Sequence, residues 1–435
     1  MTFVPSSPLP EGEGTSCFAI LQSSWKTPAP PLNPVPNNML RDYIFFADDR
    51  SNIPTSTMHI ADQIATGKIE GVNRVFWVNT YTRLPKLSEF RKAFRILTRR
   101  GAKPVVNQQV AGSTIISATP LQFPWFGPWL GTAARKFNGY FAGRFFQKLV
   151  KQYDIQHPVL ATNFPCVVDA FRTIRQLAPQ TVQIYYCYDD FIKYPGFNAQ
   201  HWETMEQEFF ATVDGVIFSS RDLQQNKKRP ESLPSLYLPH GVDYEHFSGA
   251  TTEKVPIAAL EKLKKPIIGF FGTMDFWSDL PAIAYLAKRF PQCSFAVVGR
   301  AVVPMTPLEG IENVHLFGQV PYSELPQYAR YFDVGLIPYI RHDYLKAVNP
   351  LKLREYYAIG LPVIATRVPD IADMPGPLYF ADTHEEYGDH LETILNSDLS
   401  ELRRQAQEIA KKNSWTARAE SFMQFAEQTA SAQRQ

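Results

Sequence analysis

Short apolar runs alternate with longer amphipathic stretches along most of the chain. Apolar runs without a polar face predict strands that are buried on both sides, as in a parallel sheet covered by helices. In the first half they predict strands at Tyr43–Ala47, Arg74–Val78, Pro104–Val106, Thr114–Ser117, Val159–Thr162, Val182–Cys187 and Gly215–Phe218. In the second half they predict strands at Pro266–Phe271, Ser294–Val298, Val314–Phe317, Val334–Ile337 and Pro362–Ala365. The segments between them show helical patterns, for example Thr57–Thr66 and Leu280–Phe290.

Two such series of strands and helices predict an α/β fold with two doubly wound, Rossmann-like domains facing a cleft. We expect the first domain at residues 41–247 and the second at residues 248–398. Residues 1–40 are rich in proline and predict an irregular segment, whereas residues 399–435 predict polar helices with no further strand.

Composition narrows the function classes. The 435 residues carry 44 Lys and Arg against 42 Asp and Glu, a net charge of +2, which is not the basic excess of a nucleic-acid binder. No G-x-G-x-x-G follows a strand and no P-loop motif is present, which disfavours nicotinamide and P-loop enzymes. The four cysteines are scattered, so we expect free thiols in a reducing cytosol and no metal site. We also expect no signal peptide and no membrane span.

The segment NPLKLREYYAIGLPVIAT, residues 349–366, has the features of an anion-binding helix. Asn349 and Pro350 open the helix, and its free N–H groups and partial positive charge suit a diphosphate. Lys352 adds a full charge, and Glu355, one turn further on, is placed to accept hydrogen bonds from ribose hydroxyls. The alternative is an ordinary Lys–Glu pair on a helix surface.

Two glycine-containing turns follow strands of the second series. In IIGFFGTMDFWSD, Gly272 allows the backbone to approach a ligand, and we expect Thr273 and Met274 to point into the cleft. Arg300 follows the next strand and is a candidate for neutralising phosphate, or else a solvated loop residue. Because loops at the carboxyl edge of a parallel sheet surround one ligand, these residues are candidates for a ligand site.

Two residues of the first half are candidates for catalysis. Asp189 follows the strand Val182–Cys187, so its carboxylate is expected to face the cleft as a general base, or else to cap the next turn. His59 lies in the first predicted helix, where it is either catalytic or a structural histidine.

A basic and aromatic segment spans Leu121–Val150. Aromatic residues recur at helical spacing and are accompanied by an excess of positive charge, which suits an anionic membrane surface. The alternative is that the aromatics belong to the core. The membrane-contact candidates are Trp125, Trp129, Arg135, Lys136, Arg144 and Lys148.

Several segments of the sequence resemble those of a known family. The segments GFFGTMDFWSD, FAVVGR, NVHLFGQVPYSELPQYARYFDVGLIPY and NPLKLREYYAIGLPVIAT resemble the donor domain of GT-B glycosyltransferases, within the group-1, or family-four, set. LPHGVDYEHF resembles the hinge motif of that set. ADDRSNIPTSTMHIADQIA and RVFWVNTYTRLPKL resemble the xanthan-type membrane-associated glucuronosyltransferases.

This resemblance implies a transferase that uses a nucleotide sugar, a UDP-sugar above all, and a saccharide or lipid-linked acceptor in surface polysaccharide assembly. It implies a peripheral protein on the cytoplasmic face of the membrane, with C-terminal helices that cross back to the first domain. It also implies that Asp189 is the catalytic base. The donor-pocket residues that it implies are Met274, Gln319, Tyr339, Lys352 and Glu355.

One departure from the family pattern bears on the stereochemistry. Retaining members carry E-x7-E, and counting back from Glu355 gives Ala347 where the first Glu would stand. We therefore expect an inverting enzyme. Asp189 and Asp190 form no D-x-D metal motif, and Lys352, Arg300 and the helix terminus can meet the phosphate charge, so we also expect the enzyme to be metal-independent, with no cofactor beyond its nucleotide-sugar co-substrate. The alternatives are a retaining family-four transferase, a nucleotide-sugar-binding module without activity, and a GT-B epimerase.

Overall fold

The computed structural model describes residues 40–47, 50, 54–67, 69–80, 105–110, 113–118, 127–194, 198–249 and 256–433. The proline-rich segment predicted at residues 1–40 lies outside the described residues except for Leu40, and Trp125 also lies outside them.

Eight strands form the first sheet, in the order β3-β4-β2-β1-β5-β6-β7-β8. Their bounds are β1 Arg41–Ala47, β2 Val72–Asn79, β3 Val105–Val110, β4 Ser113–Ala118, β5 Pro158–Thr162, β6 Val182–Cys187, β7 Gly215–Phe218 and β8 Ser235–Tyr237. The prediction of a wholly parallel sheet is wrong at one edge, where β3 pairs antiparallel with β4. Only two residues separate these strands, which is far too few for the crossover that parallel strands need.

The second sheet has the order β11-β10-β9-β12-β13-β14, and all its pairings are parallel. Its strands are β9 Ile267–Phe271, β10 Ser294–Val298, β11 Val314–Gly318, β12 Val334–Ile337, β13 Val363–Thr366 and β14 Leu378–Ala381. The sequence analysis missed β8 and β14, which are short and only partly buried.

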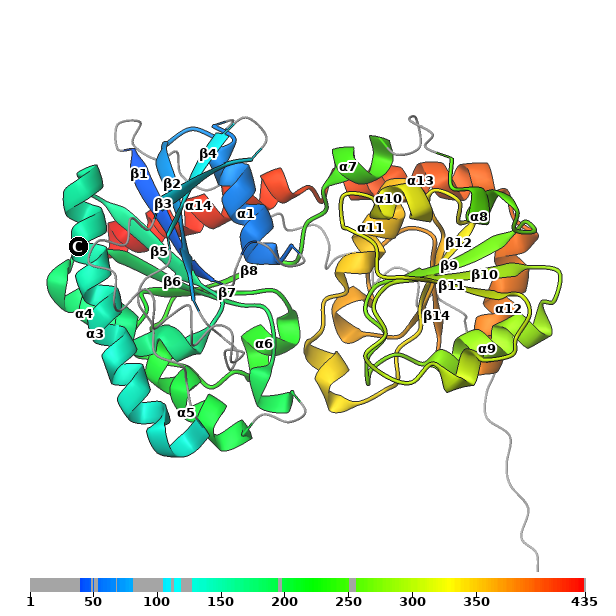
Figure 1. The fold of residues 1–435 in the computed structure, drawn as a ribbon, viewed down its shortest axis with the longest axis horizontal. Coiled ribbons are helices and arrows are strands. Elements are labelled where there is room, and N and C mark those ends of the chain that lie inside the picture. Colours follow the sequence, from blue (N-terminus) through cyan, green and yellow to red (C-terminus); the bar gives the residue numbers. More distant parts are fainter. Residues whose placement is uncertain are drawn as a thin grey trace, which may run out of the picture. The chain divides into compact units, whose positions relative to one another are not determined.

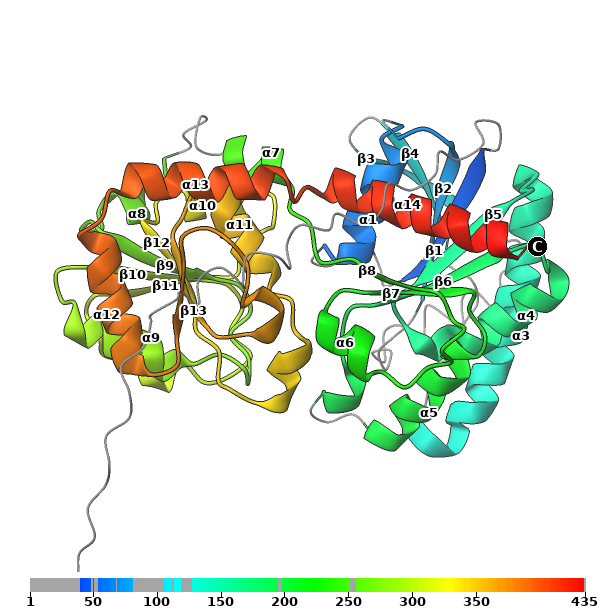
Figure 2. The same ribbon diagram turned by 180° about the vertical axis from the view of Figure 1, so that it is seen from behind.

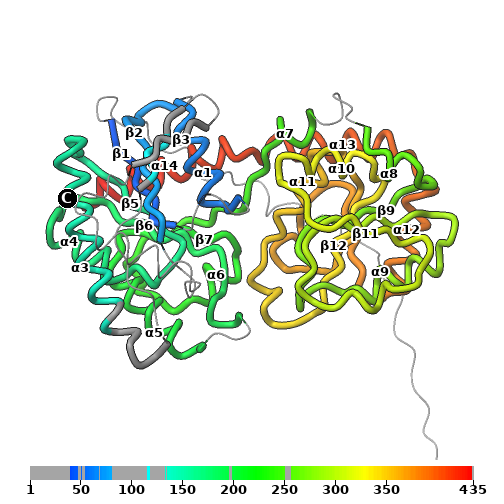
Figure 3. The backbone as a smooth tube through the Cα atoms, viewed as in Figure 1, coloured from blue at the N-terminus to red at the C-terminus, as the bar shows by residue number. Residues whose placement is uncertain are grey.

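Helices cover both faces of each sheet (Figure 1). They are α1 Ser56–Ala65, α3 Gly127–Tyr153, α4 Val168–Leu177, α5 Ala199–Phe210, α6 Arg221–Asn226, α7 Tyr244–Gly249, α8 Ala258–Glu261, α9 Leu280–Arg289, α10 Leu325–Ala329, α11 Leu351–Ile359, α12 His384–Leu395, α13 Leu399–Lys411 and α14 Trp415–Ala432. Each sheet has an apolar cluster on either face, as expected for strands without a polar side. Figure 3 follows the chain from the first sheet through α7 into the second.

The last two helices belong to different sheets. Helix α13 packs on α11 beside the second sheet, whereas α14 packs on α1 beside the first (Figure 2). In α14, Trp415 and Phe422 are buried in the apolar cluster of the first sheet, and the Phe422 ring lies 5.8 Å from that of Phe45. The end of the chain therefore completes the core of the first domain.

Candidate functional site

A pocket of about 290 Å³ lies at the carboxyl edge of the second sheet. The turns after β9, β10 and β11 form one side of it, and the N-terminus of α11 forms the other. Pro54, from the segment before α1, also reaches it. Seven of the eight predicted donor residues line this pocket: Gly272, Thr273, Arg300, Gln319, Tyr339, Lys352 and Glu355. The strand ends and the first turn of α11 thus form one site, as expected for a parallel sheet.

Lys352 lies at the amino end of α11, where the helix offers its free N–H groups. Its Nζ donates to the Tyr339 hydroxyl at 3.4 Å and lies 5.4 Å from the centre of the Phe270 ring. A Cβ at Gly272 would stand 2.0 Å from Lys352 Cε, and Gly272 has a φ of +129°. Glycine is therefore needed here both for the backbone conformation and for the space that the lysine side chain occupies.

Glu355 lies one turn further along α11 and is buried. Its Oε1 accepts a hydrogen bond from the Tyr322 hydroxyl at 3.4 Å. Burial raises the pKa of Glu355 to about 7, although the Lys352 charge and the Tyr322 hydrogen bond oppose the rise. A carboxylate at the bottom of a pocket with few partners of its own is available to accept hydrogen bonds from ligand hydroxyls.

Met274 is placed differently from the prediction. Its side chain is buried in the apolar cluster of the second sheet with Leu280 and Ile283, and it does not line the pocket. The expectation that it points into the cleft is wrong, because the backbone of Met274 pairs with Ala301 and turns the side chain into the core.

The sequence analysis did not single out Tyr322. It lines the pocket and bonds Glu355, and it stands within the NVHLFGQVPYSELPQYARYFDVGLIPY segment quoted for the resemblance.

Asp189 follows β6 and is partly buried. The Tyr344 hydroxyl donates to its Oδ1 at 3.2 Å. Burial raises the pKa of Asp189 to about 7, against the effect of the Tyr344 hydrogen bond and with a contribution from the neighbouring Asp190. A carboxyl group with this pKa changes charge near neutral pH, which is the property that a general base requires.

Asp190 has a different environment from its neighbour. The Lys227 ammonium lies 2.8 Å from Asp190 and 2.8 Å from Glu206, and Lys193 lies 3.2 Å from Asp190. These cations lower the pKa of Asp190 in spite of its burial. Asp190 is therefore held within an ion-pair network with Lys227, Lys193 and Glu206.

His59 lies on α1 and is buried. Its ring stacks on that of Trp415 with centres 4.8 Å apart and lies 5.7 Å from the Tyr322 ring. Burial lowers the pKa of His59 to about 4, so the imidazole is neutral at pH 7. Its Nε2 is buried and has no hydrogen-bond partner among the described residues. The structure thus places His59 one side chain away from the pocket lining, behind Tyr322.

Helix α3 carries the predicted membrane-contact residues. Lys136, Arg144 and Lys148 are exposed, and the exposed fractions of Phe137 and Tyr140 are 59% and 55%. Arg135 instead lies 2.6 Å from Asp169 and 3.1 Å from Glu208, so the expectation that it faces a membrane is wrong. The side chain of Trp129 is not described. In the described part of the chain, no helix is long and apolar enough to cross a bilayer.

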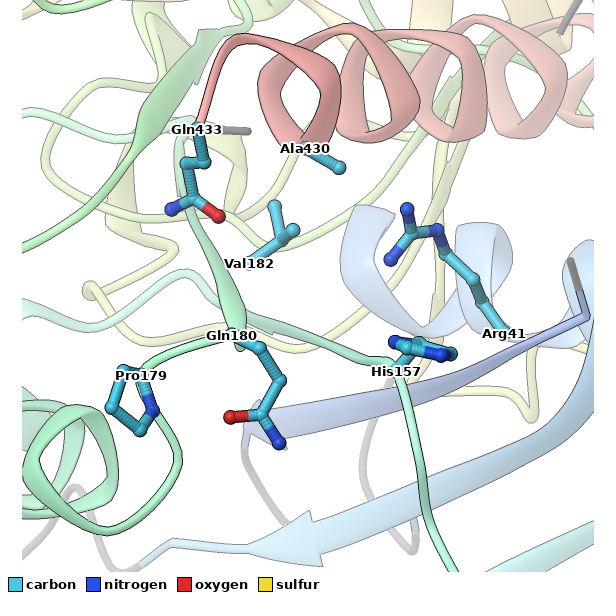
Figure 4. A pocket seen from close by; sticks show the side chains of 7 residues that line it. All are labelled: Arg41, His157, Pro179, Gln180, Val182, Ala430 and Gln433. Carbon is cyan, nitrogen blue, oxygen red and sulfur yellow. The ribbon is translucent and has the colours of Figure 1, made fainter. Parts of the chain in front are cut away.

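A second cavity, of about 440 Å³, lies at the amino edge of the first sheet. Figure 4 shows the side chains that line it. It is bordered by the start of β1 and β6 and by the end of α14. Its one arginine, Arg41, forms a bidentate ion pair with Glu427 of α14, with Nη2 2.9 Å from Oε2. The arginine therefore ties the last helix to the first sheet. Among the described residues no group of three side chains suited to a metal ion is found.

Comparison with known proteins finds a matching family model, a bacterial relative and solved structures of the same fold. Residues 265–397 match the family model of the glycosyl transferases group 1. A putative teichuronic acid biosynthesis glycosyltransferase of Bacillus subtilis, TuaH, is 29% identical over 240 residues, which are 51% of this chain and 59% of that protein.

Three solved structures share the fold. The Escherichia coli trehalose-6-phosphate structure bound with UDP-2-fluoro glucose has a TM-score of 0.64 at 13% identity, over 89% of this chain and 99% of that one. Anabaena Alr3699/HepE in complex with UDP and glucose has a TM-score of 0.59 at 15% identity, over 88% and 98% of the chains. A Burkholderia xenovorans trehalose-phosphate synthase has a TM-score of 0.63 at 12% identity, over 89% and 100%.

The two sheets and their order therefore match the GT-B fold of these solved structures. Within it, residues 265–397, which hold most of the pocket, match the family model of the glycosyl transferases group 1. The predicted fold class and the family resemblance of the second domain are confirmed.

Replacing Lys352 with Ala is expected to weaken the binding of a nucleoside diphosphate by about 10- to 150-fold. The reason is that a hydrogen bond to a charged group contributes about 1.5–3 kcal/mol. Calorimetric titration with UDP measures the effect. Lys346→Ala removes the same charge from an exposed position on the preceding turn and serves as the control. Equal affinity in the Lys352 and Lys346 variants would contradict the assignment.

Proposed function

We propose that this protein is a glycosyltransferase that moves a sugar from a UDP-sugar to a saccharide or lipid-linked acceptor during assembly of a surface polysaccharide. The observation that carries the proposal is the pocket itself. Strand-end turns, a helix N-terminus, Lys352 and a buried Glu355 meet there within a group 1 glycosyltransferase domain. The positive end of α11 and Lys352 suit a diphosphate, and Glu355 suits ribose hydroxyls.

The choice of nucleotide and of product class rests on similar proteins. Structures with the same fold hold UDP with glucose, or UDP-2-fluoro glucose. The Bacillus subtilis relative is named for teichuronic acid biosynthesis, and the matched stretch spans 59% of its length. The resemblance of the first half to the xanthan-type glucuronosyltransferases stays a prediction.

We propose that the transfer inverts the anomeric carbon. The acceptor hydroxyl attacks this carbon directly while Asp189 takes its proton, and the UDP diphosphate leaves toward Lys352, Arg300 and the α11 N-terminus. No metal ion is included, since these groups supply the positive charge. At the position of the first Glu of the retaining motif stands Ala347, which is buried and carries no polar group.

The stereochemical course tests the proposal directly. A thermal-shift screen over nucleotide sugars first identifies the donor, because a ligand that binds only the folded state raises its stability. Proton NMR of the product formed from that donor then reports the anomeric configuration. Inversion supports the proposal, whereas retention favours a family-four retaining enzyme. Donor binding without turnover on saccharide or lipid-linked acceptors favours a non-catalytic binding module, the alternative that Ala347 keeps open.

We further propose that helix α3 rests on the cytoplasmic face of an anionic membrane. Lys136, Arg144 and Lys148 lie on one exposed side of the helix with Phe137 and Tyr140, and α3 contains no acidic residue. Such a surface combines electrostatic attraction with aromatic contact at the headgroup level.

Replacing Lys136, Arg144 and Lys148 together with Gln is expected to weaken binding to phosphatidylglycerol vesicles by about 100-fold. Each charge near the surface contributes about 1 kcal/mol. Sedimentation with vesicles measures the change, and high salt should release the wild-type protein. A matched triple variant at the exposed Lys262, Lys264 and Lys411 should bind as the wild type does. Equal losses in both triple variants, or no binding of the wild type, would contradict the proposal.

A further inference from the structure

The segment between β12 and α11 contacts both domains. It contains the short 3-10 turn η4, Asp343–Ala347, and continues into Val348, Asn349 and Pro350, which line the donor pocket. Leu345 is buried in the apolar cluster of the second sheet, whereas Ala347 is buried in a cluster of the first. Helix α6 of the first domain also contacts η4. The position where retaining relatives place a Glu is therefore used here to dock this segment on the acceptor domain.

Tyr344 lies in the middle of η4 and its ring is held by other aromatic rings. It stacks on Trp277 and His342, with ring centres 6.0 and 5.8 Å apart. Tyr194, from the first domain, meets it edge-on at 5.9 Å. This packing holds the ring in place, and the hydroxyl of Tyr344 donates a hydrogen bond to Asp189 Oδ1 at 3.2 Å.

The hydroxyl of Tyr344 acts only as a donor in this contact. Burial and the nearby Asp189 hold the pKa of Tyr344 far above its usual range, so the hydroxyl keeps its proton. Tyr339 is near enough to Tyr344 to contribute to that rise, and Tyr339 itself accepts from Lys352.

We infer that Tyr344 is a positioning residue for catalysis: its hydroxyl, carried on the η4 segment of the second domain, orients the carboxylate of Asp189 in the first domain. This inference rests on the proposed role of Asp189 as base. The η4 segment, which lacks the first Glu of the retaining motif, would thus act through Tyr344.

The charged and titratable groups that face Asp189 set the direction of the pH effect. Tyr344 donates a hydrogen bond to Asp189, and Asp190 is the neighbouring negative charge. Tyr194, which directly follows the 3-10 turn η2 (Phe191–Lys193), is also close enough to Asp189 to interact with it electrostatically. Lys227 and Lys193 are bound to Asp190. Removing the Tyr344 hydroxyl therefore leaves burial and Asp190 to raise the pKa of Asp189, with no hydrogen bond to oppose them.

The test is Tyr344→Phe, which keeps the aromatic packing and removes only the hydroxyl. We expect kcat to fall by about 10- to 100-fold at pH 7, with the KM for the donor within twofold of wild type. The acidic limb of the kcat/KM profile should move to higher pH, so that the loss shrinks above pH 8. Tyr379→Phe, on the edge strand β14 of the second sheet, is the matched control and should behave as the wild type does.

A double variant distinguishes positioning from a general structural role. In an Asp189→Asn background, Tyr344→Phe should cause little further loss, because the group that it positions is already gone. An equal additional loss in that background, or a loss of kcat with an unmoved pH profile, would overturn the inference while leaving Asp189 as base. If Asp189→Asn alone keeps normal turnover, the proposed base is wrong and this inference fails with it.

Discussion

Replacing Asp189 with Asn is expected to lower turnover by about 10²–10⁴-fold, the range that general-base catalysis supplies. The amide keeps the shape of the carboxylate but cannot accept the proton of the acceptor hydroxyl. Donor affinity should change little, because Asp189 does not line the donor pocket and all but one of the described lining residues belong to the second domain. Steady-state kinetics and calorimetric titration with UDP measure the two quantities separately.

The pH dependence of kcat/KM tests the same assignment of Asp189. Since burial raises the pKa of Asp189 to about 7, the wild-type kcat/KM should rise with pH through that value as the base becomes ionised. The neighbouring Asp190→Asn is the matched comparison. Its carboxylate is already bound by Lys227 and Lys193, so this variant should lose stability and keep most of its turnover. Near-normal turnover in Asp189→Asn would contradict the role of base.

Replacing Lys227 with Met is expected to lower the free energy of unfolding by about 3–5 kcal/mol at pH 7, the usual cost of leaving a buried charge without its partner. The ammonium group is buried between Asp190 and Glu206, 2.8 Å from each. Glu206 is also bound by the Tyr185 hydroxyl at 3.0 Å. Met has similar length but no charge, so the two buried carboxylates would be left facing each other.

The pH dependence of this loss follows from the same network. Without Lys227, the pKa values of both carboxyls rise in the folded protein, so the variant loses stability as pH rises above their unfolded values near 4. The difference from wild type should therefore be smaller at pH 5 than at pH 7 in urea unfolding. Lys193→Met removes a partly exposed partner of the same Asp190 and should cost no more than about 1 kcal/mol. Equal losses in both variants would contradict the bridging role of Lys227.

Features that depend on neighbouring residues were predictable from the sequence alone. Apolar runs such as Val182–Cys187 and Ser294–Val298 marked strands correctly, because a strand buried on both faces is mostly apolar and shows no alternating polar face. The donor helix was predictable for a similar reason. Asn349, Lys352 and Glu355 are close in the sequence, and the helical repeat alone brings them to one end and one face.

Features that depend on distant residues were decided only by the tertiary structure. The side chain of Met274 turns into the core because its backbone pairs with Ala301. Arg135 forms ion pairs with Asp169 and Glu208, which lie on other helices. Asp189 and Tyr344 stand 155 positions apart and meet because η4 docks on the acceptor domain. The spacing of residues within an element determines which side chains share a face. Which element that face meets depends on how all the elements pack together, and no local pattern in the sequence records that.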